Sequence, residues 1–293
     1  MVTKLALGSA VFGMAYGIAR SSDAAVAPDE VRRILFTGRA AGLDVIDTAM
    51  AYGNSEQVLG QAGLDGWRVV SKIGQVPEDD VELASWLEDS VRKSLTRLGI
   101  VQLHAFLLHD VRQLLGSNGQ RIAKALLRLV EIGLVGRIGV SIYGPDQLER
   151  ICEVIRPGLV QVPFNPLDRR IETSGWADRL SSMGTEIHVR SVFLQGVLLM
   201  PPHVRLARFA KWAPVWDAWD EWQNRSQLSA RDLCLSLSLS RPWVHKVIVG
   251  VENAGQLEQL LAAPNNAPIA PPDLLTSGIA DTQLIDPFNW SKS

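Results

Sequence analysis

The sequence predicts an α/β protein with a single domain, a closed parallel (β/α)8 or TIM barrel, and three observations support this. Eight short runs rich in apolar residues alternate with longer stretches of helical periodicity, which is typical of parallel strands joined by crossover helices. The chain has 293 residues, a length at which such barrels often form one domain. Polar residues stand at the ends of successive strand-like runs, where a barrel has its active site. We therefore expect one barrel domain over residues 1–293, with a C-terminal tail at 264–293.

The eight strand-like runs are distributed over most of the chain. They are Lys4–Ser9, Leu43–Asp47, Trp67–Lys72, Leu103–His109, Arg137–Ser141, Leu159–Val162, Glu186–Ser191 and Lys246–Gly250. The competing fold is a doubly wound open sheet, which would place a G-x-G-x-x-G turn after the first strand. Gly8, Gly13 and Gly17 do not have that spacing, so the closed barrel is favoured.

Helices are predicted between these runs because apolar residues recur every three or four positions. The spacing predicts helices over 81–98 and 120–132, and Pro145 with Asp146 opens another that runs to about Ile155. Four tryptophans at near-helical spacing indicate a helix packed on the barrel. They are Trp212, Trp216, Trp219 and Trp222.

The composition restricts the class of partner. The formal net charge is −2, so neither nucleic acid nor an anionic membrane is expected as a main partner. No apolar run is long enough to span a membrane. The N-terminal LALGSAVFGMA is interpreted as the first strand rather than as a signal peptide, which predicts a cytoplasmic protein. The two cysteines, Cys152 and Cys234, are interpreted as buried thiols.

The polar residues at the strand ends are best explained by one shared pocket. They are Asp47, Lys72, His109, Ser141, Gln161, Arg190 and Ser191. His104 lies at the opposite end of its strand, where barrel residues serve stability, so no catalytic role is assigned to it. The other histidines have no carboxylate or cysteine at ligand spacing, and no metal site is expected. They are His188, His203 and His245.

At this point the sequence resembles the aldo-keto reductase family. The motifs that carry the resemblance occur in the family's order over nearly the whole chain. They are LALGSAVFGMAYG, DVIDTAMAYGNSEQVLG, VVSKIG, FLLHD, GRIGVSIYG, VQVPFNPLDRR, VRSVFLQGVLL, VIVGVENAGQLEQ and LIDPFNW. The resemblance implies an oxidoreductase that transfers a hydride between a nicotinamide cofactor and the carbonyl of a small aldehyde, ketone or sugar.

The resemblance also implies a catalytic tetrad of Asp47, Tyr52, Lys72 and His109. A phenol is a weak acid at neutral pH, and a nearby ammonium favours its ionised form, so we expect Lys72 to make Tyr52 a better proton donor. Asp47 is expected to hold the lysine by an ion pair, and His109 to orient the carbonyl oxygen. The segment 53–55 is expected to cap the following helix, with Glu56 in its first turn.

For the cofactor, the resemblance implies that Ser141 and Gln161 hold the carboxamide. The nicotinamide would lie near Arg190 and Ser191. Many relatives have a tyrosine where Arg190 stands, and a planar guanidinium can also stack. Many also have Asn after the serine, where this chain has Ile142.

The adenosine end of the cofactor is implied to lie at Gly250, Glu252 and Gln256, with backbone N–H groups facing phosphate. The segment 250–256 has no Arg or Lys, and Glu252 would repel a 2′-phosphate. We therefore expect NAD(H) to be favoured over NADP(H).

Two other functions compete with a reductase or dehydrogenase. The same fold could serve as an NAD(P)(H)-binding regulatory or accessory protein with little turnover. Alternatively, Lys72 could be the Schiff-base lysine of an aldolase-type barrel, but this would leave Tyr52, Ser141 and Gln161 without a joint role. The sequence does not specify the substrate or an oligomeric state.

Overall fold

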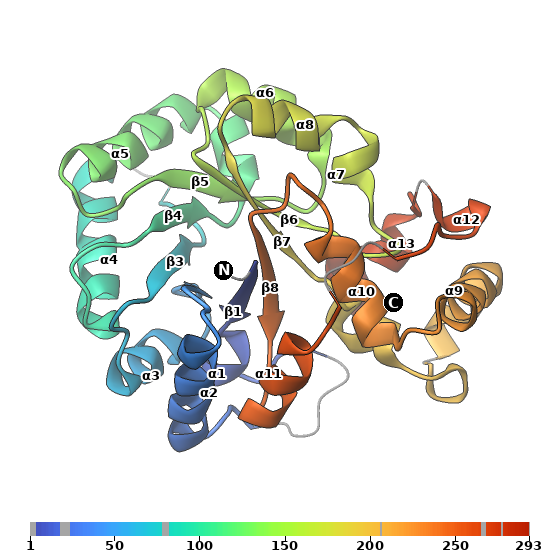
Figure 1. Ribbon diagram of the computed structural model, residues 1–293. Helices are drawn as coiled ribbons and strands as arrows, with labels where there is room; N and C mark the ends of the chain where they lie inside the picture. The colour runs from blue at the N-terminus through green and yellow to red at the C-terminus, as the bar shows by residue number, and fades with distance from the viewer. Residues whose placement is uncertain are drawn as a thin grey trace.

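The structure is a computed structural model that describes residues 4–17, 24–77, 82–205, 207–264, 268–276 and 278–292. Eight parallel strands close into one barrel, each paired with its neighbours in chain order and the last with the first (Figure 1). The predicted single-domain (β/α)8 fold is therefore confirmed. The strands are β1 (Leu5–Gly8), β2 (Val45–Asp47), β3 (Arg68–Ile73), β4 (Ala105–Leu108), β5 (Ile138–Ser141), β6 (Leu159–Pro163), β7 (Glu186–Arg190) and β8 (Lys246–Gly250).

Alternation along the strands divides the side chains into an inner and an outer layer. Asp47, Lys72 and Gln161 meet inside the barrel, so the residues two positions earlier on the same strands also face inward. Those residues belong to a small separate apolar cluster that fills the interior. It consists of Ala6, Val45, Val70, Ala105, Leu107, Leu159 and Ile248. The interior is thus packed below the polar residues, which confines the site to the C-terminal ends of the strands.

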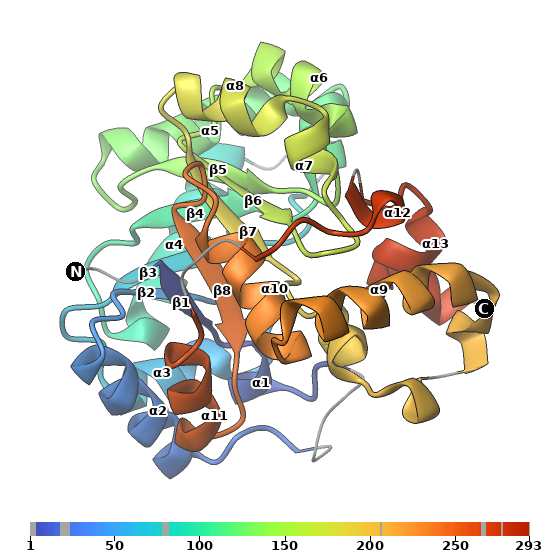
Figure 2. The ribbon, with the colours of Figure 1, turned by 45° about the vertical axis from the view of Figure 1, so that its right-hand side comes forward.

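Helices form the outer layer around the barrel (Figure 2). Helix α4 begins at Leu83, and the predicted start at Val81 lies outside the described residues. The predicted helix from Pro145 is a 3-10 turn, Pro145–Gln147, continued by α6. The surrounding helices are α2 (Pro28–Ala40), α3 (Ser55–Ala62), α4 (Leu83–Leu98), α5 (Gly119–Glu131), α6 (Leu148–Val154), α8 (Trp176–Ser182), α10 (Ala230–Leu239) and α11 (Ala254–Leu261).

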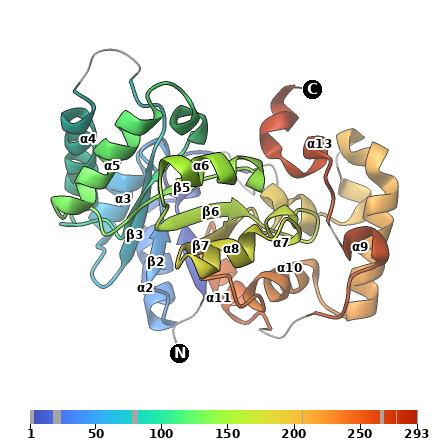
Figure 3. The same cartoon turned by 90° about the horizontal axis from the view of Figure 1, so that it is seen from above.

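A group of elements stands to one side of the barrel, away from α4 and α5 (Figure 3). It contains α9 (Ala213–Ser226), the helix that carries three of the four tryptophans. This helix packs against α12, α10 and the preceding 3-10 segment Ala207–Trp212 rather than on the strands. Trp216, Trp219 and Trp222 are buried on this helix, whereas Trp212 precedes it and is partly exposed. The group consists of α9 (Ala213–Ser226), α12 (Asp273–Thr276), α13 (Thr282–Ile285) and the 3-10 segment Pro287–Lys292.

Several smaller predictions can be compared with the structure. Cys234 is buried, as predicted, whereas Cys152 is only partly buried. Residues 265–267, 277 and 293 of the predicted tail lie outside the described residues, and the boundary at 264 stays a prediction. Within the described ranges, no helix is both long and apolar enough to cross a lipid bilayer.

Candidate active site

The site is built on an ion pair between β2 and β3. The Lys72 ammonium lies 2.7 Å from Oδ2 of Asp47 and also donates to the backbone carbonyl of Thr48 at 2.8 Å. Lys72 is completely buried, and a buried lysine needs such a partner. Burial by itself would lower the pKa of Lys72, but the charge of Asp47 and the neighbouring Tyr52 raise it above its usual value. The lysine is therefore fixed in place as an ammonium.

The second oxygen of Asp47 connects the pair to the other side of the barrel. Gln161 on β6 donates from Nε2 to Oδ1 of Asp47 at 2.6 Å. Ser141 on β5 donates to Oε1 of Gln161 at 3.3 Å. Four of the predicted strand-end residues thus form one hydrogen-bonded group, which holds the Asp47 carboxylate from two directions.

Tyr52 lies over this group on the turn that follows β2. The centre of its ring is 5.1 Å from the Lys72 ammonium and 6.2 Å from the centre of the His109 ring, which meets it edge-on. The structure therefore brings the four predicted catalytic residues together.

The turn that carries Tyr52 is packed tightly against the short helix α1 (Ala10–Gly13). A Cβ at Gly13 would lie 2.0 Å from the Tyr52 carbonyl oxygen, and Gly53 has a φ of +56°. Ser55 ties the turn to the end of β1, because its hydroxyl donates to the carbonyl oxygen of Ser9 at 2.9 Å. The predicted cap is only partly correct, because Asn54 occupies the cap position of α3 without a side-chain hydrogen bond. The two glycines, Gly13 and Gly53, therefore allow the backbone of the Tyr52 turn to pack directly against α1.

The protonation states differ in one respect from the expectation. Burial raises the pKa of Tyr52 and outweighs the opposing effect of the Lys72 charge. Lys72 therefore does favour the phenolate, but the net shift is upward because the ring is nearly enclosed. Burial, with the charges of Lys72 and Arg190, lowers the pKa of His109 to about 4. At neutral pH the site thus holds a protonated phenol and a neutral imidazole.

A cavity of about 600 Å3 opens beside Tyr52, within the range typical of small-molecule sites. Its wall runs from Tyr52, Gln161 and Arg190 at the centre of the barrel to Gln256 on α11. Polar groups therefore stand at both ends of the cavity, as an extended ligand with two polar ends requires. This arrangement fits the nicotinamide dinucleotide that the resemblance implies.

The segment after β8 lines the far end of this cavity. Three of its backbone N–H groups, which were expected to face phosphate, already donate to protein side chains. The amide of Glu252 donates to Oε1 of Gln256 at 2.8 Å, and the amide of Ala254 donates to Glu30 at 2.8 Å. The amide of Gln256 is taken by the side chain of Asn253. A phosphate at these amides would therefore have to displace protein side chains.

Arg231 and Tyr16 are among the residues of this wall that the sequence did not predict. Arg231 on α10 reaches the cavity and is ion-paired with Asp232, with Nε 2.9 Å from Oδ1. Tyr16 lines the opposite side. No local signal marks either residue, because their position depends on how α10 and the first loop fold back over the barrel mouth.

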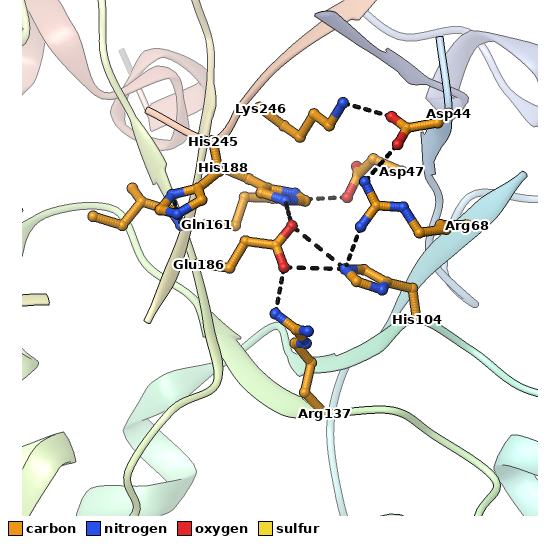
Figure 4. A network of polar contacts seen from close by, with 11 residues as sticks. Asp44, Asp47, Arg68, His104, Arg137, Gln161, Glu186, His188, His245 and Lys246 are labelled. Carbon is orange, nitrogen blue, oxygen red and sulfur yellow. Dashed lines mark hydrogen bonds and ion pairs between the residues drawn. The ribbon is translucent and has the colours of Figure 1, made fainter. Parts of the chain in front are cut away.

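A charged cluster lies towards the other end of the barrel, beneath Asp47 and Gln161 of the site (Figure 4). Glu186, at the start of β7, accepts hydrogen bonds from His104 at 3.1 Å and from His188 at 2.8 Å. Arg137 pairs with the same carboxylate at 2.5 Å. Glu186 and His188 are successive inward residues of one strand, so the carboxylate lies beside the imidazole. Among the described residues, no group of three or more His, Cys, Asp or Glu side chains is arranged to hold a metal ion.

Comparisons with known proteins agree with this geometry. The chain is 31% identical over 188 residues to an aldo-keto reductase of Mycobacterium sp. (strain KMS), an alignment that covers 60% of this chain and 64% of that protein. It is 26% identical over 226 residues to the L-glyceraldehyde 3-phosphate reductase of Escherichia coli (strain K12), covering 68% and 64%. The chain thus spans slightly less than two thirds of the length of these two relatives.

Solved structures share the same fold. The structure of the glycerol dehydrogenase of Gluconobacter oxydans superimposes with a TM-score of 0.72 at 20% identity, covering 91% of this chain and 88% of that one. The sequence model of the Aldo/keto reductase family matches residues 4–273. This range includes the barrel strands and all the predicted site residues. On this match, the chain belongs to the Aldo/keto reductase family.

Proposed function

We propose that the chain transfers a hydride between a nicotinamide cofactor and the carbonyl group of a small aldehyde, ketone or sugar, with Tyr52 as the proton donor. The observation that carries the proposal is the buried Asp47–Lys72 pair beneath Tyr52 at the wall of the cavity. Family membership supports an oxidoreductase of this type. The roles of the individual residues are part of the proposal.

In the proposed mechanism the cofactor supplies the hydride, and the protein supplies the proton and the orientation. Tyr52 gives its phenolic proton to the carbonyl oxygen, and the fixed charge of Lys72 stabilises the phenolate that remains. Neutral His109 donates a hydrogen bond to the same oxygen and positions the carbonyl. Asp47 and Gln161 keep the lysine in place. The raised pKa of Tyr52 suits a donor, because the phenol stays protonated until the transition state is reached.

The cofactor would be held along the cavity. Gln161 lines the cavity and Ser141 donates to it, and both would serve the carboxamide. Arg190 and Ser191 would lie beside the nicotinamide. Gly250, Glu252 and Gln256 lie at the adenosine end.

We propose that NAD(H) is favoured over NADP(H). Glu252 lines this end of the cavity, so its carboxylate would oppose a 2′-phosphate. Glu30, which binds the Ala254 amide, is paired with Arg33 at 2.9 Å. Arg231 also lines the cavity, and its charge is already paired with Asp232. Dissociation constants for NADH and NADPH test this, and NADPH binding about tenfold more tightly would contradict it.

Turnover with a matched pair of variants tests the proposal as a whole. We expect oxidation of NADH or NADPH over many cycles with members of an aldehyde and sugar panel. Tyr52→Phe should lower kcat by at least about a hundredfold and leave cofactor binding unchanged. Tyr16→Phe removes a hydroxyl from the same cavity and should keep most activity. Tight cofactor binding without turnover of any substrate would instead support a regulatory or accessory protein.

The Schiff-base function is disfavoured by the state of Lys72. An amine must lose its proton to attack a carbonyl, and a desolvated lysine without a carboxylate partner does so readily. Lys72 has a carboxylate partner, Asp47, which raises the pKa of the lysine. Borohydride trapping with a carbonyl substrate should therefore add no mass to this residue.

A further inference from the structure

Arg190 presents a positive charge to the reaction centre without an acidic partner. Its guanidinium donates to the carbonyl oxygen of Ile142 at 3.0 Å and to the Ser191 hydroxyl at 3.1 Å, and it lies 4.8 Å above the centre of the Tyr143 ring. No Asp or Glu among the described residues lies within ion-pair distance of it. The charge is therefore held in place but not neutralised.

The backbone after Arg190 is constrained in a way that fixes this position. Ser191 has a φ of +56°, which is unusual for a residue other than glycine. Asn165 holds the Ser191 carbonyl oxygen by a hydrogen bond of 3.0 Å. Strained residues persist only where their surroundings hold them, and they concentrate at functional sites.

The charges beside Tyr52 are paired, whereas the Asp286 carboxylate acts on the Tyr143 ring over which Arg190 lies. Lys72 is balanced by Asp47, and the buried Asp168 is balanced by Arg170 at 2.8 Å. His109 is neutral above about pH 4. Arg190 contributes to the lowered pKa of His109, so its field extends across the centre of the site. A ligand beside Tyr52 therefore lies near the guanidinium of Arg190, a cation without an ion-pair partner among the described residues.

We propose that Arg190 makes the site bind the reduced cofactor in preference to the oxidised one. This rests on the proposed function. A carbonyl whose oxygen contacts Tyr52 can receive a hydride only from a nicotinamide ring in contact with it, which places the ring within the field of Arg190. The ring is neutral when reduced and carries one positive charge when oxidised, so Arg190 opposes only the oxidised form.

The chemistry balances without a further reactant. Two electrons and one hydrogen pass as hydride from the reduced ring to the carbonyl carbon, and the Tyr52 proton passes to the oxygen. A proton from solvent then restores Tyr52. The charge of Arg190 would oppose the positive charge of the oxidised ring, so the oxidised cofactor would be held more weakly than the reduced one.

The test compares the dissociation constants of NAD+ and NADH, measured by quenching of tryptophan fluorescence at pH 7.5. We expect the ratio of the NAD+ constant to the NADH constant to fall about tenfold in Arg190→Gln, which corresponds to about 1.4 kcal/mol. Arg190→Lys keeps the charge and should keep most of the ratio. An unchanged ratio in Arg190→Gln would overturn the inference.

Arg231→Gln is the matched control, because it removes a cation from the far end of the same cavity. The two redox forms are identical there, so this change should alter both constants by the same factor. A change of ratio as large as that in Arg190→Gln would overturn the local role of Arg190. If neither nucleotide binds the wild-type protein, the proposed function fails together with the inference, whereas binding with an unaltered ratio refutes the inference alone.

Discussion

The Lys72 ammonium is buried against the Asp47 carboxylate, with 2.7 Å between Nζ and Oδ2 and exposed side-chain fractions of 0% and 6%. The two residues come from neighbouring strands and lie on the inward face of each. Because both side chains are buried, water cannot solvate either charge if its partner is removed. The pair should therefore behave as one unit, in which the loss of either member affects both stability and chemistry.

Replacing Lys72 by Met should cost both activity and stability. The change leaves Asp47 buried without a cation, and breaking a buried pair typically costs about 3–5 kcal/mol. We expect a fall in kcat of at least about a hundredfold and a lower urea midpoint. Steady-state kinetics and urea denaturation measure the two effects.

A second Lys–Asp pair, in which Asp44 is partly exposed and also pairs with Arg68, supplies the control. Lys246 and Asp44 pair at 2.5 Å at the opposite end of the barrel (Figure 4). Lys246→Met should lower stability and leave kcat within about twofold. Equal losses of kcat in the two variants would mean that Lys72 acts only through folding.

Gly13→Ala should displace Tyr52. An added Cβ would lie 2.0 Å from the Tyr52 carbonyl oxygen and 2.3 Å from the Ser55 nitrogen, so the turn must move. Because a shift of about 1 Å can cost about a hundredfold in rate, we expect kcat to fall by at least about tenfold. Gly74→Ala is the control, since a Cβ there meets nothing within 4 Å. A Gly13→Ala protein with normal kcat would show that the contact does not position the tyrosine.

The neutral state of His109 should make the protein less stable in acid. Its pKa is about 4 when folded and about 6.5 when unfolded, so the unfolded chain binds more protons between these values. The free energy of unfolding should therefore decrease as the pH falls from about 6.5 to 4, with up to roughly 3 kcal/mol from this residue. Denaturation of His109→Gln over this range should show a shallower slope, and an equal slope would contradict the assignment.

Glu186→Gln should affect stability alone. Burial by itself would raise the pKa of Glu186, but hydrogen bonds from His104 and His188 hold it well below its usual value. The neutral amide removes the negative charge that Arg137, His104 and His188 contact. We therefore expect the free energy of unfolding to fall by about 2–4 kcal/mol. The kinetic constants should stay within about twofold, because the cluster lies at the end of the barrel remote from Tyr52. A fall in kcat without a loss of stability would refute this division.

Much of the site was predictable because it follows from periodicity along single strands. Asp47, Lys72 and Gln161 were expected together, since each ends a strand and parallel strands present those ends on one face. The structure confirms that they meet. Their catalytic roles remain a proposal, which the variants above test.

The sequence by itself determined the barrel, its eight strands and the polar residues at their ends, because these depend on local patterns that each segment carries. Only the tertiary structure decided which distant groups share an environment. It placed Arg231 in the cavity wall, left Arg190 without an acidic partner and put His104 on the carboxylate of Glu186. Closure of the barrel and the register between strands set such contacts, and a residue's own neighbours in the chain do not encode them.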